Sequence, residues 1–512
     1  MPFIREVDDL LEMQRELEAF LRSLAHPVVV EDESELFDLT AARWKLTVEF
    51  GKLLFEAWNA ARSIARRVEG IAYRDRGRMG IFARKPGGRE TGTLEFRELE
   101  PPQRAGRTRA ADRPRFRRQF LALLAREYSG WHLEGVSSRS DLERSFSIWY
   151  TRGLARQGRT GWAFLGLGET EPVAAADGVL AHGLIWLDWL RSQSQHATVP
   201  GLKLFLPPAA VQLTAHRAAC LNARAAQVEI LEWKMGDARP VPVDLRDYGN
   251  VETRLAPRRQ GELLVEAHRP LLREWAGDSL EEMDLVADPS GNSTSLRVRG
   301  LEVARGEGQI SPRVYFGLEG SVQKLEDANR GDFRRLLKDV LELRDARSRN
   351  TSHEFYRLQS ERWLESLLLR DITKIDPELV PSCVYPQVPA FSATDRGVID
   401  VLSVTRRGRL AVIELKLQEE INLPIQGLDY WLRVKWLADR KQLQERGYFH
   451  GVELAQAPPL LYLVCPAFRF HSTTGQVLRY FHPSIEIIQV GLNDQWREGV
   501  QVLFRRAARA SP

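Results

Sequence analysis

The chain has 512 residues and a mass of 58.4 kDa, more than one hydrophobic core usually organises, so we expect several domains. Its 43% hydrophobic and 28% charged residues and its net charge of +4 are typical of a soluble globular protein. The opening MPFIREVDDLLEMQRELEAFL carries acids and lacks the apolar stretch of a signal peptide. The richest apolar run, GVLAHGLIWLDWL, is interrupted by His182 and Asp188 and is too short for a membrane span. We therefore expect a cytoplasmic protein with no membrane partner.

Three cysteines, Cys220, Cys383 and Cys465, lie far apart in the sequence and form no CxxC motif. This spacing is unlike that of a disulfide framework or a zinc site. We expect three buried free thiols in a reducing compartment.

The first region, residues 1–138, is expected to be helical at its start and basic further on. Leucines and tryptophans recur at heptad-like spacing up to about residue 68, which predicts helices. From Arg62 to Arg118 there are seventeen Arg and Lys against seven Asp and Glu, which fits phosphate contacts or a solvated surface about equally well. Within this segment GRMGIFARK and GTLEFREL, separated by KPGGRE, predict a β-hairpin.

Residues 139–260 alternate between strand-like and helix-like segments, in the order GWAFLGLG, GVLAHGLIWLDWLRSQ, GLKLFLP, AAVQLTAHRAACLNAR and QVEILEW. This alternation predicts a central α/β domain with a largely parallel sheet. GLGETE matches neither a Walker loop nor GxGxxG, so no nucleotide site is predicted there. Residues 261–348 mix helices with short strands and predict an α+β connector. The polar stretch RSRNTSH marks the start of the last domain, residues 349–512.

An acidic residue two positions before a lysine occurs three times, in Glu232-Trp233-Lys234, Glu414-Leu415-Lys416 and Asp439-Arg440-Lys441. The chain has only eleven lysines among its seventy-three basic residues, so one or two such matches are expected by chance. The third match lies in helix-patterned sequence, where residues two apart diverge. No Asp-bearing strand precedes the first at hairpin distance. Only the middle match has the context of a site.

The segments VIDVLSV and RLAVIELKL predict two strands joined by TRRGR, with Gly408 available for a positive-φ turn position. Side chains alternate along a strand, so Glu414 and Lys416 share one face. A turn centred near Arg407 pairs residues whose numbers sum to about 814. This pairing puts Asp400 opposite Glu414, with Cβ atoms about 4.5–5.5 Å apart.

Two carboxylates at that spacing repel each other unless a cation lies between them. Mg²⁺, which takes oxygen ligands at about 2.1 Å, fits Asp400 and Glu414, and Mn²⁺ is a substitute. Lys416 on the same face can orient or activate water, because a lysine ammonium changes its pKa more readily than a guanidinium. The alternative is an edge hairpin with cross-strand ion pairs.

Asp400, a turn and then Glu414-x-Lys416 resemble the active-site hairpin of the PD-(D/E)XK nuclease superfamily. Ten residues after the lysine, QGLDY from Gln426 to Tyr430 is similar to the Q-x-x-x-Y motif of the RecB-like and lambda-exonuclease-like branches. The resemblance covers about residues 350–470, a quarter of the chain, and departs from the pattern where Ile399 replaces a proline. It implies a restriction-endonuclease-like αβ core with a mixed sheet.

The resemblance also implies a glutamate on the helix before the site strands. SERWLESLLLRDI supplies Glu361 and Glu365. We prefer Glu361 as a metal ligand that binds through water, and expect Glu365 at a solvated helix edge. VYPQVPAF makes Gln387 a candidate neighbour of the pocket. Gln426 and Tyr430, four residues apart on one helix face, are implied to hold the site or to contact DNA.

The residues and the resemblance together predict a multidomain α/β protein that acts as a Mg²⁺-dependent nuclease on DNA, in phage defence or repair. Asp400, Glu414 and Glu361 would hold the metal, and Lys416 would position or activate the nucleophile. Two alternatives stay open: a nucleic-acid-binding or assembly protein with an unused nuclease fold, and an RNA-directed nuclease. Protein partners, self-association and strand preference also stay open.

Overall fold

The chain, seen in a computed structural model, forms two compact units. The first comprises Met1–Asp112, Pro270–Asp278 and Glu302–Asp339, and the second Arg113–Arg269, Ser279–Leu301 and Val340–Pro512. The domain boundaries expected after residues 138, 260 and 348 stay predictions. The structure describes residues 7–24, 27–31, 34–39, 43–49, 52–58, 63–75, 78–84, 91–98, 105–141, 143–193, 198–246, 253–255, 257–287, 293–308, 312–318, 322–391 and 396–508.

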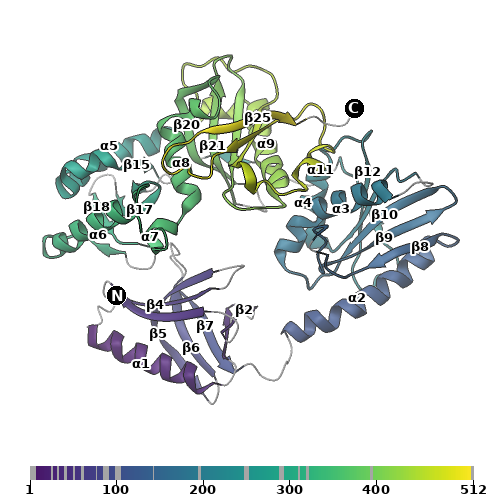
Figure 1. The fold of residues 1–512 in the computed structure, drawn as a ribbon, viewed down its shortest axis with the longest axis horizontal. Coiled ribbons are helices and arrows are strands. Elements are labelled where there is room, and N and C mark those ends of the chain that lie inside the picture. Colours follow the sequence, from purple (N-terminus) through teal and green to yellow (C-terminus); the bar gives the residue numbers. More distant parts are fainter. Residues whose placement is uncertain are drawn as a thin grey trace. The chain divides into compact units, whose positions relative to one another are not determined.

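The first unit contains an antiparallel seven-stranded sheet with a long helix packed against it (Figure 1). The strand order is β2-β1-β7-β6-β5-β4-β3. Leu17 and Phe20 of the helix share one apolar core with Leu53 and Phe96 of the strands. The elements are α1 Val7–Ser23, β1 Pro27–Glu31, β2 Ser34–Asp38, β3 Arg43–Glu49, β4 Lys52–Trp58, β5 Ser63–Asp75, β6 Arg78–Arg84 and β7 Thr91–Glu98.

The expectation of helices up to residue 68 is wrong beyond α1, because β1 to β4 and the start of β5 follow it. The heptad-like spacing conceals an alternation of period two. Leu53, Phe55 and Ala57 are all 0% exposed, and they are separated by less buried residues. Burial at every second position belongs to a strand with one face on the core.

The basic segment from Arg62 to Arg118 includes β5, β6, β7 and the start of the next helix. The expected hairpin is confirmed, because β6 and β7 pair antiparallel along their length, while the connecting KPGGRE lies outside the described residues. Among the described residues of this segment, five arginines lie close to acids: Arg67 and Arg84 to Glu69 at 4.0 Å and 2.9 Å, Arg74 to Glu16 at 3.0 Å, Arg97 to Glu95 at 3.4 Å and Arg113 to Glu171 at 2.6 Å. Part of the positive charge is therefore balanced within the fold.

The second unit contains a six-stranded sheet in the order β13-β12-β11-β10-β9-β8. The predicted alternation of strands and helices is confirmed. The sheet is mixed, however, and not largely parallel, because β10, β11 and β12 are parallel while the outer pairings are antiparallel hairpins. The elements are α2 Ala105–Glu127, β8 His132–Ser137, β9 Tyr150–Gln157, β10 Thr160–Leu167, α3 Val173–Gln193, β11 Gly201–Leu206, α4 Pro208–Ala218, β12 Gln227–Glu232 and β13 Val241–Pro242.

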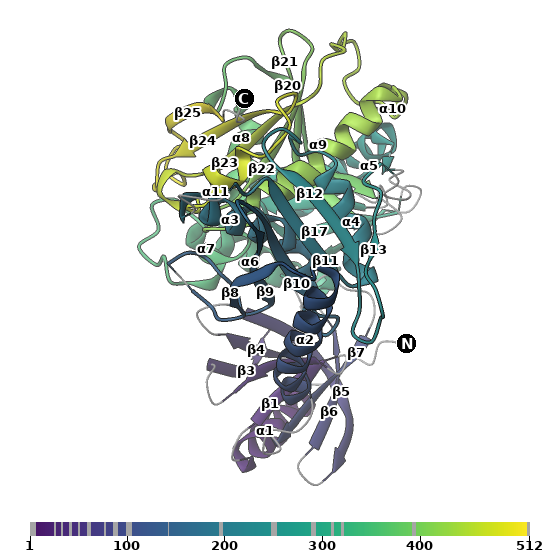
Figure 2. The same ribbon diagram turned by 90° about the vertical axis from the view of Figure 1, so that its right-hand side faces the viewer.

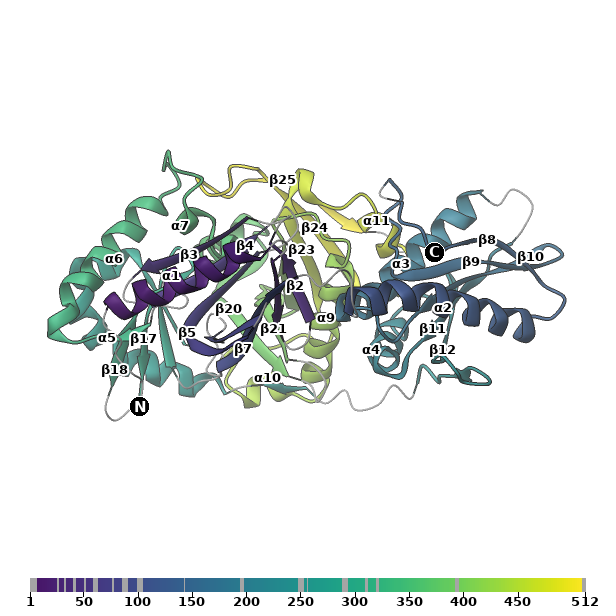
Figure 3. The same cartoon turned by 90° about the horizontal axis from the view of Figure 1, so that it is seen from below.

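Helices cover both faces of this sheet (Figure 3). Phe120 of α2 packs on Phe164 of β10, whereas the next residue, Leu165, belongs to the core that α3 and α4 build on the other face. Contrary to the sequence-based expectation, α3 is long and apolar enough to span a membrane, but 61% of its apolar window is buried inside the fold. That burial is the pattern of a core helix.

The expectation for the cysteines is confirmed in that all three are free. Cys383 and Cys465 are buried and Cys220 is half-buried.

The chain between the six-stranded sheet and the C-terminal sheet mixes helices and short strands, as expected for an α+β segment. β15 pairs antiparallel with β16, and β17, β18 and β19 pair antiparallel in succession. The elements are α5 Arg258–Ala276, η1 Gly277–Glu282, β15 Asp284–Ala287, β16 Ser293–Val298, β17 Leu301–Glu307, β18 Arg313–Phe316, β19 Gln323–Lys324, η2 Asp327–Asn329 and α6 Arg330–Leu343.

The C-terminal sheet has seven strands in the order β14-β20-β21-β22-β23-β24-β25, of which β21 to β25 are seen in Figure 2. It is mixed, because β22, β23 and β24 are parallel and the other pairings are antiparallel. The elements are β14 Arg254–Leu255, α7 Glu354–Arg357, α8 Ser360–Arg370, η3 Ile372–Lys374, β20 Leu379–Phe391, β21 Arg396–Thr405, β22 Leu410–Leu415, α9 Leu423–Asp439, α10 Gln442–Glu445, β23 Leu460–Pro466, η4 Ala467–Arg469, α11 Thr474–Leu478, β24 Glu486–Leu492 and β25 Val502–Ala508.

Alternation along β22 assigns α8 and α9 to opposite faces of this sheet. Val412 belongs to the same core as Leu428 of α9, whereas Ile413 belongs to the same core as Leu364 of α8. The protein is therefore a mixed α/β protein with several sheets, and the end of β22 lies between the two helices.

Candidate active site

The β21–β22 hairpin has the register expected from the sequence. Val401–Val404 pair with Leu410–Ile413 so that paired numbers sum to 814 (401 + 413). The turn uses Gly408 at a φ of +77°, where an added Cβ would lie 2.1 Å from a backbone oxygen, so glycine is required there. Continuing this register by one residue puts Asp400 opposite Glu414.

Asp400 and Glu414 meet at the end of the hairpin. The backbone N–H of Leu415 donates to Asp400 Oδ2 at 2.9 Å. Glu414 is only 1% exposed, and its Oε2 has no hydrogen-bond partner among the described residues. Burial, and after it the negative charge of Asp400, raises the pKa of Glu414 well above its ordinary value. Because a buried unpartnered oxygen is costly, this atom is suited to a cation or a donor.

Lys416 lies among the carboxylates at the same end of β22. Its Nζ is 3.2 Å from Glu414 Oε1 and 3.8 Å from Glu361 Oε2, and its side chain is 20% exposed. Burial lowers the pKa of Lys416, but the charges of Glu414, Glu361 and Asp400 together outweigh burial and raise the pKa above its ordinary value. Lys416 is therefore a stable ammonium that three carboxylates share.

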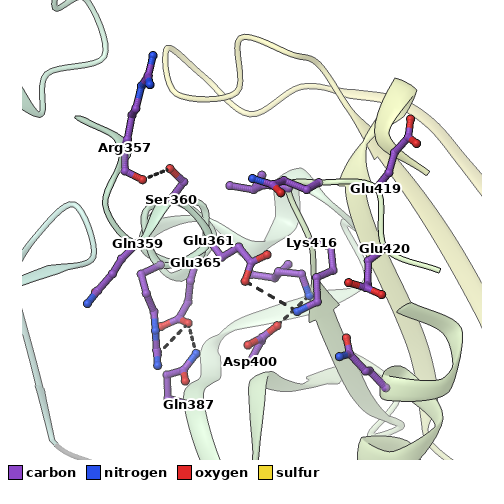
Figure 4. Close-up of a pocket in the computed structure, with 15 residues that line it drawn as sticks. Arg357, Gln359, Ser360, Glu361, Glu365, Gln387, Asp400, Lys416, Glu419 and Glu420 are labelled. Atoms are coloured by element: carbon purple, nitrogen blue, oxygen red, sulfur yellow. Dashed lines mark hydrogen bonds and ion pairs between the residues drawn. The ribbon is translucent and has the colours of Figure 1, made fainter. Parts of the chain in front are cut away.

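A cleft of about 680 Å³ opens over these side chains (Figure 4). Glu361 and Glu365 reach it from α8, Asp400 from β21 and Lys416 from the end of β22. Glu414 does not line the cleft and is covered from solvent. The cleft therefore exposes the lysine and one carboxylate of the hairpin, with the second carboxylate buried behind them.

Glu361 occupies the first turn of α8 and points toward Lys416 (Figure 4). Its side chain is 48% exposed. Partial burial raises the pKa of Glu361, and the charge of Lys416 opposes that effect. The preferred third metal ligand therefore contacts the lysine.

Glu365, one turn further along α8, is not at the solvated helix edge that the sequence suggested. It is 3% exposed because α8 packs this side against the fold. Its carboxylate accepts a hydrogen bond from Gln387 and lies 3.4 Å from Arg362 and 3.8 Å from Arg297. Burial raises the pKa of Glu365 to about 7, against the lowering effect of the two arginines and Gln387. Arg362 lies three residues before Glu365 on the same helix, but spacing alone could not reveal Arg297 and Gln387 as partners, because these two lie on other elements.

Gln426 and Tyr430 lie in the first two turns of α9, as expected. Gln426 lines the cleft, and its Oε1 has no hydrogen-bond partner in the described part of the chain. Tyr430 does not line the cleft. Burial, followed by the charges of Glu414 and Asp400, raises the pKa of Tyr430 above its ordinary value. Of the two, only Gln426 is placed to meet a bound molecule.

The carboxylates fit a hard divalent cation that takes two protein ligands. Within the described ranges, no group of three or more His, Cys, Asp or Glu side chains is arranged to hold a metal. Mg²⁺ needs fewer, because it is usually bound by one or two carboxylates and fills its other positions with water and substrate oxygens. Asp400 and Glu414 provide such a pair, and the partnerless Oε2 of Glu414 is a suitable donor.

Comparisons with known proteins do not assign the chain to a family. Neither the models of protein families nor the curated proteins include a match to it. The geometry of the cleft and the resemblance of its motif therefore indicate what the protein does.

Proposed function

We propose that the protein is a metal-dependent nuclease that hydrolyses phosphodiester bonds in DNA. The observation that carries the proposal is the convergence of Asp400, Glu414 and Lys416 at the end of the hairpin, with more carboxylates than cations; Asp400 and Lys416 line the cleft and Glu414 is buried behind them. A structural ion pair balances its charges, whereas here a buried carboxylate oxygen has no partner among the described residues. Buried ionisable groups with perturbed pKa values beside a cleft are typical of catalytic sites.

The order of elements around the cleft supports the resemblance to the PD-(D/E)XK superfamily. α8, β20, β21, β22, α9 and β23 occur in this order along the chain, with the short helix η3 between α8 and β20 and α10 between α9 and β23, and α8 and α9 cover opposite faces of a mixed sheet. The site residues lie at the end of the central hairpin. The resemblance thus rests on arrangement as well as on spacing, and it favours DNA as the substrate.

Asp400 and Glu414 are the residues that would hold Mg²⁺. A bound cation supplies charge neutralisation at the scissile phosphate and lowers the pKa of a coordinated water. Holding the cation also relieves the repulsion between the two carboxylates, which otherwise favours protonation of Glu414.

Lys416 would position or activate the attacking water. Without a metal, burial lowers its pKa, but the charges of Glu414, Glu361 and Asp400 outweigh burial and favour the ammonium. From the cleft surface it can orient the attacking water or stabilise negative charge on the phosphoryl oxygens. Glu361, on α8, holds the ammonium through the 3.8 Å contact.

The experiment that tests the proposal offers the purified protein linear and circular DNA, single- and double-stranded DNA, and RNA, with Mg²⁺, Mn²⁺ or EDTA. We expect DNA cleavage in either metal and none in EDTA. Lys416→Ala should lose cleavage by about a hundredfold or more while it keeps most of the DNA affinity, because the ammonium acts on the reaction.

Lys441→Ala is the matched control, since Lys441 belongs to another acidic-x-lysine triplet but is exposed outside the cleft. It should cleave at the parental rate. Binding without cleavage of any nucleic acid would favour the binding or assembly protein. Cleavage of RNA alone would favour the RNA-directed nuclease.

A further inference from the structure

Gln387 has a backbone conformation that is rare within a strand. It lies inside β20, yet its φ is +50°. The left-handed region costs free energy for a residue with a side chain, and such residues concentrate at functional sites where neighbouring contacts hold them. Gln387 is 5% exposed and lines the same cleft as Asp400 and Lys416. A strained, buried residue therefore forms part of the wall of the site.

The strained position lies opposite Asp400 in the β20–β21 ladder. On either side of it the ladder is regular, with Pro386 paired to Val401 and Val388 paired to Ile399. The pair between them, Gln387 and Asp400, is missing from the ladder. The register is the same on both sides, so no residue is inserted and the ladder is interrupted at this pair alone.

In both β20 and β21 the alternation of side chains between the two sheet faces is interrupted near Gln387 and Asp400. In a regular strand, residues three apart point to opposite faces. Tyr385 and Val388 nevertheless belong to one apolar core, and so do Ile399 and Leu402. The side chains of β20 therefore reverse their facing between Tyr385 and Val388, and those of β21 between Ile399 and Leu402. This reversal sets the direction in which the Asp400 carboxylate leaves the sheet.

The side chain of Gln387 is anchored on α8. Its amide donates a hydrogen bond to Glu365, and Figure 4 shows the two side chains pointing toward each other. Glu365 is buried, and Arg362 and Arg297 balance its charge at 3.4 Å and 3.8 Å. A charged acceptor makes a stronger hydrogen bond than a neutral one, so this contact can hold a strained residue.

We propose that Gln387 is a positioning residue of the nuclease site. By bonding to Glu365 it holds the turn of β20 that directs Asp400 toward Glu414. The inference rests on the proposed function and assigns Gln387 no contact with the reacting phosphate. An amide suits this position, because a carboxylate would repel Asp400 and Glu365, and an aliphatic side chain could not donate to Glu365.

Gln387→Gly and Gln387→Asn test this role. Glycine and asparagine both accept a positive φ, so the backbone turn is kept, but neither reaches Glu365 as glutamine does. Lys441→Gly is the control, because Lys441 also has a positive φ of 58° and is exposed outside the cleft. We expect kcat on duplex DNA to fall about tenfold or more in both Gln387 variants, with KM changed by less than about twofold. The control should keep the parental values.

The affinity for Mn²⁺, measured by electron paramagnetic resonance, separates this inference from the proposed function. In both Gln387 variants it should weaken about fivefold or more, because Asp400 is displaced. A parental value of either kcat or Mn²⁺ affinity in Gln387→Gly would overturn the positioning role. A parent that binds Mn²⁺ but cleaves nothing would overturn the nuclease proposal, and the Mn²⁺ affinities would still decide about Gln387. Unfolding of both variants would also overturn the role, because the amide would then serve the fold alone.

Discussion

Two places in the second unit put charged side chains into apolar surroundings, and they do so differently. Where α4 meets α9, Arg217 donates to both oxygens of Asp429 at 2.9 Å and 2.7 Å. At the end of the β21–β22 hairpin, one ammonium is shared among three carboxylates. The first place is electrically balanced, and the second has an excess of negative charge.

The difference lies in what each cluster still requires. Between α4 and α9 the nearly buried carboxylate of Asp429 is matched by Arg217, which also donates to the carbonyl of Asp177 and lies 3.9 Å from the half-exposed carboxylate of that residue. Removal of either partner would leave a buried charge uncompensated. The cluster at Lys416 already contains uncompensated negative charge without any substitution. The first arrangement therefore stabilises the fold. The second is less stable, and its excess negative charge is of use only to a bound cation or substrate.

The largest effect is expected from breaking the balanced pair. Arg217→Ala should destabilise the protein by about 3–5 kcal/mol, because Asp429 stays buried without its partner. Arg479→Ala is the control, since Arg479 pairs with Asp188 at 3.0 Å on the surface and should cost about 1 kcal/mol or less. Urea denaturation curves measure both. Equal losses of unfolding free energy in the two variants would mean that burial does not make the first ion pair more important than the second.

A pH titration sharpens the comparison at Glu365, a buried carboxylate with two arginine neighbours. Burial raises its pKa from 4.5 to about 7, so between these values the folded state holds the proton more tightly than the unfolded state. Stability should therefore fall as pH rises from 4.5 to 7, by about 3 kcal/mol at most. Glu365→Gln should flatten that part of the stability profile. A parental slope in the variant would exclude Glu365 as its source.

Relieving the unbalanced cluster should have a smaller effect, of opposite sign. Without divalent metal, Asp400→Asn should stabilise the protein by about 1 kcal/mol, because it removes a charge that repels Glu414. The parent should gain thermal stability as Mg²⁺ is added, and the variant should not. Asp439→Asn, at an exposed pair with Lys435, is the control and should show no gain. A loss of stability in Asp400→Asn would mean that the hairpin charges are balanced after all.

The smallest effect is expected from exposed basic residues of the segment from Arg62 to Arg118. Arg115, Arg117 and Arg118 are exposed on α2. If they bind phosphates, reversing all three to glutamate should weaken DNA binding and reduce the slope of log K against log salt by about 0.9 for each phosphate that is no longer neutralised. An unchanged slope would assign these arginines to a solvated surface.

The sequence allowed the hairpin to be predicted because its information is local. Alternation in RLAVIELKL, a glycine at position 408 and the distance from Asp400 to Glu414 determine the register without reference to the rest of the chain. The N-terminal strands were mistaken for helices because leucines seven residues apart, such as Leu39, Leu46 and Leu53, suggested a helical period, although apolar residues also recur at every second position, as in Leu53, Phe55 and Ala57.

Long-range pairing could not be predicted in the same way. Arg217 meets Asp429 across two helices that are far apart in the sequence, and Arg297 reaches Glu365 from a strand that carries no motif. The partners of a buried charge follow from how elements pack and not from their spacing. The sequence therefore predicted which residues meet at the end of the hairpin, but not which neighbours hold them in place.

The apolar core on the α9 face of the C-terminal sheet ties the C-terminal segment to the α3–α4 layer. Leu180 and Leu184 of α3 belong to the same buried cluster as Leu423 and Leu428 of α9. A fragment cut out at residue 349 would leave this surface uncovered in water, and an exposed patch of that kind favours aggregation. The candidate catalytic segment therefore cannot be transferred to another protein by itself. Gene fusion or recombination that moved it would have to carry the α3–α4 layer along.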